Sequence, residues 1–183
     1  MERHPWNQEF TWSLPPATGV LAPAERAHFD DHGFVIARGV LDATEVATVR
    51  DDLDRWEAET DAALRRRRDG RVAIAETGAI TFTVHLVIRS PVARAFAAHP
   101  WFVALAVDLI GPDVNLYWDQ AVYKKPEKPR RFPWHQDNGY TFVEPQQYLT
   151  CWVPLTEATV ENGCPQVTPR VHQIGKASCR ERV

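Results

Sequence analysis

His135 and Asp137 lie two residues apart in the stretch WHQDNG, between a proline-rich basic segment and a Gly-Tyr pair. In an extended backbone, side chains two positions apart point to the same face, so both could reach one metal ion while Gln136 points away. An imidazole and a carboxylate are two of the three ligands of the facial triad that holds non-haem Fe(II); the third is a second histidine. The alternative is a polar turn in which Asp137 accepts backbone N–H groups. The pair alone leaves both interpretations open.

The segments around this pair must deliver it to a fixed place. Residues 115–125 are typical of a long strand, and the proline-rich residues 126–133 predict a stiff loop that leads to the pair. We expect Trp134 to pack in the core beneath the ligand segment. Two further strands are predicted after the pair, at residues 147–155 and 164–169.

The first half of the chain is richer in helical patterns. Pro23 suits a first helical turn and Gly33 a helix end, while Asp42 or Thr44 can cap a long amphipathic helix. Because helices come first and strands later, the order favours an α+β protein over alternating βαβ units. The predicted helices are 23–32, 42–67, 90–100 and 101–111, and the predicted strands before residue 115 are 34–41, 71–76 and 79–88.

The composition is that of a globular protein and gives no sign of a charged macromolecular partner. The chain has 183 residues, of which 44% are hydrophobic and 25% charged, and its net charge is −3. Neither nucleic acid nor a membrane is therefore expected as a partner, and the run Arg65–Arg68 is best explained as a solvated helix end. The apolar runs are too short to span a bilayer, and the N-terminus has no hydrophobic signal core. Three cysteines without CxxC spacing predict reduced thiols and a cytoplasmic location.

Several motifs together resemble the phytanoyl-CoA dioxygenase (PhyH-like) family. They are FPWHQDNGY, YLTCWVPL and ENGCPQVTP, preceded by HFDDHGFVIARGVLDATEVATVRDDLD, and the resemblance runs from about His28 to about Gly175. It implies a double-stranded β-helix, a jelly-roll or cupin-like barrel, with N-terminal helices. It also implies Fe(II) as cofactor, 2-oxoglutarate as cosubstrate and O2 as oxidant, with hydroxylation of a small organic substrate. The matched motif assigns His135 and Asp137 as metal ligands.

The resemblance also suggests residues that contact the cosubstrate. A polar residue on the strand before the loop is expected to touch 2-oxoglutarate; Tyr123 is the first choice and Gln120 the second, since the sequence does not fix which face points inward. Thr150 and Trp152 share one face of the predicted strand 147–155 and are expected to border the pocket. For each of the four, ordinary packing in a barrel wall is the alternative.

The chain departs from the family pattern near its end. The family's distal histidine and its 2-oxoglutarate-binding arginine match no residue here, and His172 is expected to be a loop histidine rather than a ligand. We therefore predict an extended arm over residues 1–22, an incomplete dioxygenase domain over 23–173 that lacks its last strands, and a non-native tail over 174–183. The alternative function is a non-catalytic barrel fragment or a binding module without a complete iron site. The oligomeric state stays open.

Overall fold

The computed structural model describes residues 2–7, 9–128, 132–141, 143–175 and 177–178. These residues divide into two compact units, and each is described by itself. Unit 1 comprises Met1–Val40, Pro100–Val114 and Pro133–Arg182, and unit 2 comprises Leu41–His99 and Asn115–Phe132. His135 and Asp137 belong to unit 1.

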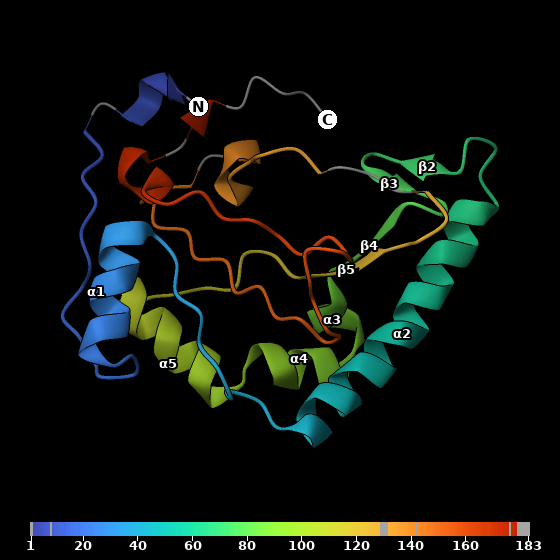
Figure 1. The fold of residues 1–183 in the computed structure, drawn as a ribbon, viewed down its shortest axis with the longest axis horizontal. Coiled ribbons are helices and arrows are strands. Elements are labelled where there is room, and N and C mark those ends of the chain that lie inside the picture. The colour runs from blue at the N-terminus through green and yellow to red at the C-terminus, as the bar shows by residue number, and fades with distance from the viewer. Residues whose placement is uncertain (1, 8, 129–131, 142, 176, 179–183) are drawn as a thin grey trace. The chain divides into compact units, whose positions relative to one another are not determined.

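Unit 1 combines two helices with short 3₁₀ turns and long irregular segments (Figure 1). Pro23 lies in the first turn of its first helix, and Gly33 ends that helix with a left-handed backbone, φ 81°, as the sequence predicts. The strands β1 and β6 pair antiparallel. The elements of this unit are β1 (Glu2–Arg3), η1 (Pro5–Asn7), α1 (Pro23–His32), α5 (Pro100–Leu109), η2 (Asp137–Tyr140), η3 (Val171–Ile174) and β6 (Ala177–Ser178).

The core of unit 1 lies where α1, α5 and the N-terminal arm meet. Its buried residues are Leu21, Phe29, Leu105 and Leu109, and Trp12 of the arm packs against them. Beside this cluster, the buried Asp108 of α5 holds the arm: its carboxylate accepts the backbone N–H and the hydroxyl of Thr18 and pairs with Arg26 at 3.0 Å. Burial alone would raise the pKa of Asp108, but these hydrogen bonds and the guanidinium lower it.

Unit 2 is a long helix packed on an antiparallel sheet. The helix begins at the predicted cap Asp42, whose carboxylate accepts the N–H of Glu45 while the Glu45 side chain accepts the N–H of Asp42. The sheet has the strand order β2-β3-β4-β5. The elements are α2 (Ala43–Arg65), β2 (Arg71–Val72), β3 (Ala75–Glu76), β4 (Ile80–Val84), α3 (Leu86–Arg89), α4 (Pro91–Ala97) and β5 (Gln120–Lys124).

The pairing of β4 with β5 determines which side chains face α2. Thr81 lies opposite Tyr123 in the register, and Phe82 lies opposite Val122. Thr81 and Tyr123 both bond to side chains of α2, so their face of the sheet is the helix-covered one. Because strand side chains alternate, Phe82 and Val122 lie on the opposite face, and 44% of Val122 is exposed.

The structure confirms the α+β class, with a mixture of helices and antiparallel strands, and places the four predicted helices close to their predicted bounds. The predicted strands fare less well. Residues 34–41, 147–155 and 164–169 are irregular rather than extended strands, and the long strand 115–125 shortens to β5. The strand predicted over 79–88 ends at Val84, and α3 begins at Leu86. Residues 34–41, 147–155 and 164–169 have no neighbouring strand among the described residues. A run of β-branched residues forms a strand only where it can pair with another strand.

No single described helix is long and apolar enough to cross a membrane, although α4 and α5 counted together reach that length and hydropathy as a broken pair.

Candidate metal centre

His135 and Asp137 stand where an extended segment becomes a tight turn. The backbone has no regular structure up to Gln136, and Asp137 is the first residue of the 3₁₀ turn η2. Two backbone hydrogen bonds close this turn, from Gly139 N to Gln136 O at 2.9 Å and from Thr141 N to Asn138 O at 3.3 Å. The prediction that both side chains face the same way is thus met through a turn at Asp137 rather than through a continuous strand.

The imidazole of His135 is fixed by its own backbone. Nδ1 lies 2.9 Å from the carbonyl oxygen of Pro133, which makes Nδ1 the protonated donor, and Nε2 lies 3.2 Å from Oδ1 of Asp137. A histidine anchored through Nδ1–H presents Nε2 as the nitrogen that can bind a metal. The proline before Trp134 therefore supplies the carbonyl that selects the tautomer.

The pair is electrostatically coupled. The hydrogen bond to Asp137 raises the pKa of His135 above its ordinary value, against the opposing effect of burial. The same hydrogen bond lowers the pKa of Asp137, and the Thr150 hydroxyl lowers it further. The side chains of His135 and Asp137 are 25% and 41% exposed, so both are partly open to solvent. The two pKa shifts share one cause, the contact between the imidazole and the carboxylate.

Thr150 completes the surroundings of the carboxylate. Its Oγ1 donates to Oδ2 of Asp137 at 2.7 Å, although the two residues are 13 positions apart in the chain. The sequence places Thr150 near the site, on the expected pocket face, but does not predict this contact. Asp137 therefore has a different partner at each oxygen.

Gln136 points away from the pair, as alternation predicts, and anchors the segment behind it. Its Nε2 donates to the carbonyl oxygens of Val171 at 3.2 Å and Gly175 at 3.1 Å. Val171 is the first residue of η3 and Gly175 follows its last, so this short turn supports the backbone that links the two candidate ligands. No local sequence signal identifies this contact, which joins residues 35 and 39 positions apart.

η3 is in turn docked on the end of α1. The backbone N–H of Arg170 donates to His32 O, and Nε2 of His172 lies 2.9 Å from Asp30 O. Trp12 meets the His172 ring edge-on, and a Cβ on Gly33 would lie 2.1 Å from Nδ1 of His172. His172 is thus a docking residue of this turn and not a partner of His135, in agreement with its interpretation as a loop histidine.

The donor set fits two of the three ligands of the triad. His135 Nε2 and Asp137 Oδ1 are an imidazole nitrogen and a carboxylate oxygen, the donor types of that triad, and they lie 3.2 Å apart. Among the residues that the structure describes, no group of three or more His, Cys, Asp or Glu side chains gathers to hold a metal. His85, for instance, packs against Trp118 and lies at the N-cap of α3.

The remaining predicted site residues lie in different units. Trp152 shares unit 1 with the pair and is 56% exposed; Trp134 is 42% exposed, so its predicted burial in the core is wrong.

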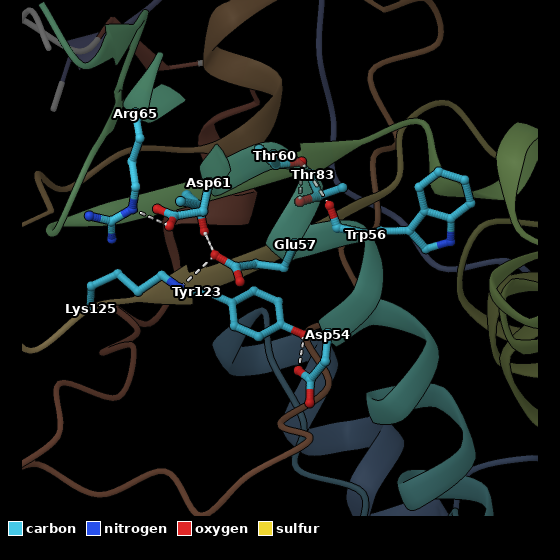
Figure 2. Close-up of polar contacts among 10 residues, drawn as sticks. Asp54, Trp56, Glu57, Thr60, Asp61, Arg65, Thr83, Tyr123 and Lys125 are labelled. Atoms are coloured by element: carbon cyan, nitrogen blue, oxygen red, sulfur yellow. Dashed lines mark hydrogen bonds and ion pairs between the residues drawn. The ribbon is translucent and has the colours of Figure 1, made fainter. Parts of the chain in front are cut away.

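Gln120 and Tyr123 belong to unit 2 and to opposite faces of β5. Figure 2 shows Tyr123 pointing to α2, where its hydroxyl donates to Asp54 at 2.7 Å. The Oε1 of Gln120 accepts Nε1–H of Trp118.

Comparisons with known proteins place most of the chain in one family. The family model of phytanoyl-CoA dioxygenase (PhyH) matches residues 29–183. Ectoine dioxygenases of Bordetella parapertussis and Bordetella bronchiseptica are each 27% identical over 153 residues, which covers 79% of this chain and 47% of theirs. A phytanoyl-CoA dioxygenase of Arabidopsis thaliana is 27% identical over 85 residues, 46% of this chain and 30% of the relative. No solved structure matches significantly.

The family match covers most of the chain. This chain belongs to the phytanoyl-CoA dioxygenase (PhyH) family. It spans about half the length of the Bordetella relatives, so the activity of the whole protein is taken up as a proposal.

Proposed function

We propose that the protein is an Fe(II)- and 2-oxoglutarate-dependent dioxygenase that hydroxylates a small organic substrate. The observation that carries the proposal is the pair itself: His135 Nε2 and Asp137 Oδ1 lie 3.2 Å apart, in the motif that the family match covers. In the overall reaction, a substrate C–H bond and 2-oxoglutarate each take one oxygen atom of O2, giving the alcohol, succinate and CO2.

His135 and Asp137 would hold the iron, and Fe(II) would supply the redox centre at which O2 and 2-oxoglutarate react. The protein's own contribution is orientation. Pro133 O keeps the His135 proton on Nδ1, and the η2 turn brings the Asp137 carboxylate to the same side. One neutral and one anionic ligand leave the centre with a net positive charge, which favours an anionic chelating cosubstrate.

Of the four residues expected to bind the cosubstrate, Trp152, Gln120 and Tyr123 remain proposed for that role, whereas Thr150 is bound to Asp137 and is taken up separately below. For Gln120 and Tyr123 the proposal rests on the family resemblance, and their contacts give an order of preference. The Tyr123 hydroxyl is already bound to Asp54, whereas Gln120 is bound to Trp118 through Oε1. No described residue accepts a hydrogen bond from the Gln120 NH2 group, which can therefore donate to a carboxylate. We therefore favour Gln120 over Tyr123, which reverses the order chosen from the sequence.

The finer fold and location belong to the same proposal. A double-stranded β-helix is the barrel that the family resemblance implies, and the antiparallel β4–β5 pair is compatible with part of its wall. A cytoplasmic location is proposed from the cysteines, of which Cys151 and Cys164 are free thiols in the structure. The substrate is proposed only as a small organic molecule, because the relatives are named for two chemically different substrates, ectoine and phytanoyl-CoA.

Anaerobic Fe(II) titration followed by exposure to O2 tests the function. We expect the chain to bind Fe(II), and His135→Ala to remove that binding, since one of the two donors is lost. With 2-oxoglutarate present, O2 should then produce succinate and CO2. His4→Ala serves as the control, because the His4 ring packs against Trp6 in the N-terminal arm and the substitution should leave metal affinity unchanged.

The second candidate, a binding module without turnover, is supported by the finding that the described residues supply two facing donors rather than three. Fe(II) binding that depends on His135 but yields no succinate would favour this candidate. Fe(II) affinity that is the same in the wild type and in His135→Ala would refute the metal assignment itself.

A further inference from the structure

The two oxygens of the Asp137 carboxylate are engaged differently. Oδ1 faces His135 Nε2 at 3.2 Å, while Oδ2 accepts the Thr150 hydroxyl at 2.7 Å. Two contacts in different directions fix both the position and the rotation of a planar carboxylate. A carboxylate held only by His135 could rotate about its Cβ–Cγ bond and exchange its oxygens, because the terminal torsion of aspartate is broad.

Thr150 is suited to this task by its chemistry and by its distance in the chain. A hydroxyl has a single proton to donate, and its β-branched side chain has few accessible χ1 rotamers. The segment around Thr150 has no regular secondary structure, so the hydrogen bond links it directly to η2. While the Thr150 hydroxyl donates its hydrogen bond to Asp137, it cannot donate to a carboxylate of 2-oxoglutarate.

We propose that Thr150 is a positioning residue for the metal ligand Asp137 rather than a direct contact of the cosubstrate. By occupying Oδ2, it directs Oδ1 toward the metal and keeps the carboxylate monodentate. This inference rests on the proposed Fe(II) site. A bidentate carboxylate would fill a coordination position that a facial-triad centre leaves open for cosubstrate and O2.

Three variants separate the hydroxyl from the shape of the side chain. Thr150→Val keeps the branched shape without the hydroxyl, Thr150→Ser keeps the hydroxyl, and Thr168→Val changes an exposed threonine of the same unit. The probe is Co(II), titrated anaerobically into each full chain while the visible absorption spectrum reports affinity and coordination geometry. Thermal unfolding of the metal-free proteins is measured alongside.

We expect Thr150→Val to weaken Co(II) binding about tenfold, the lower end of the usual effect of removing a partner of a metal ligand. The spectrum should also change, because the freed Oδ2 can enter the coordination sphere. Thr150→Ser should bind Co(II) as the wild type does, and so should Thr168→Val. Unfolding temperatures should be similar for all four proteins, because the Thr150 hydrogen bond is at the surface.

Unchanged Co(II) affinity in Thr150→Val would overturn the inference, and so would a loss in Thr150→Ser as large as in Thr150→Val. If the wild type binds no Co(II), the proposed metal site fails, and the positioning role is then decided without metal. Amide exchange at Gly139 and Thr141, whose hydrogen bonds close η2, should be faster in Thr150→Val. Equal exchange rates would refute the contact as a positioning device.

Discussion

Two carboxylates with basic partners show how differently the two units use the same chemistry. Glu57 of α2 accepts Lys125 Nζ at 2.6 Å and the Thr81 hydroxyl at 2.9 Å, and its side chain is 10% exposed (Figure 2). Asp137 has a comparable set, an imidazole and a threonine hydroxyl, but is 41% exposed. The first group is closed between a helix and a sheet, and the second is open to solvent.

The two carboxylates differ in the free-energy cost of losing a partner. Removing a partner from Glu57 leaves a charge in a place that water reaches poorly, so its contacts are bound to the stability of unit 2. In the proposed site, Asp137 would exchange its histidine contact for a cation and stay solvated, because it stands at the surface and both partners remain nearby. Burial, more than the identity of the residues, separates a structural ion pair from a candidate binding site.

The largest effect is expected at the closed group. Lys125→Met removes the cation from Glu57, and we expect it to lower the free energy of unfolding by about 3 kcal/mol, because an unpaired carboxylate remains buried. Urea denaturation followed by circular dichroism measures the change.

The double variant Glu57→Gln with Lys125→Met is the control. It leaves no buried charge and keeps a hydrogen-bond acceptor for Thr81, so it should be more stable than Lys125→Met alone. A double variant that is less stable than the single one would show that the charge was not the cause, and the contrast with Asp137 would lose its basis.

The sequence predicts the parts of the molecule that depend on neighbours in the chain. The caps at Asp42 and Gly33 use contacts within one helical turn, so α1 and α2 could be placed from the sequence. The prediction of a strand over residues 34–41 was wrong, because an apolar β-branched segment forms a strand only where it pairs with another strand. The phase of β5 could not be fixed without α2: the contacts of Tyr123 with Asp54 and of Lys125 with Glu57 show which face the helix covers.

The candidate site divides in the same way. The spacing of His135 and Asp137 predicted that they would meet, and the structure brings them to 3.2 Å. The supports of the pair come from distant positions, with Thr150 bonded to Asp137 and Gln136 bonded on both sides of η3. Neither the periodicity of the sequence nor a motif predicts these contacts, because they depend on how irregular segments fold back on one another.

A smaller effect is expected behind the open pair. Gln136→Ala removes two hydrogen bonds to carbonyl oxygens, and we expect a loss of about 1–2 kcal/mol, since the acceptors are partly buried. Exchange of the Gly175 amide should become faster as η3 loosens. Gln173→Ala, at an exposed position of the same turn, should change neither quantity. Equal effects of the two substitutions would mean that Gln136 does not anchor this segment.

Next in size is another contact between α2 and the sheet, that of Tyr123 with Asp54. Tyr123→Phe removes the hydrogen bond to Asp54 and should cost about 1 kcal/mol. Burial, together with the Asp54 hydrogen bond, raises the pKa of Tyr123, so the wild-type hydroxyl keeps its proton at any moderately alkaline pH. A double-mutant cycle with Asp54→Ala measures the coupling. A coupling free energy near zero would place this contact with the weak surface pairs rather than with Glu57.

The smallest effect is expected from the open pair itself, and its pH dependence identifies it. The pKa of His135 is raised above its ordinary 6.5, so its contribution to stability is full below that pH and is lost as the pH rises through the folded-state pKa. The pKa of Asp137 is lowered from 3.8, so its contribution is present above that pH and is lost as the pH falls through the folded-state value. His135→Ala should therefore differ from the wild type most between about pH 4 and 6.5, by less than about 1 kcal/mol because the pair is partly exposed.

Metal binding should show the opposite trend. A metal needs the neutral imidazole, so the stabilisation of the wild type by added Co(II) should grow as the pH rises and the His135 proton leaves. Thermal unfolding across this pH range, with and without Co(II), measures both trends in one protein. If the metal-free pair and the metal-bound protein were stabilised most at the same low pH, the proton and the metal would not compete for Nε2. His135 and Asp137 would then form a surface ion pair that, like Glu57 and Lys125, does not bind metal.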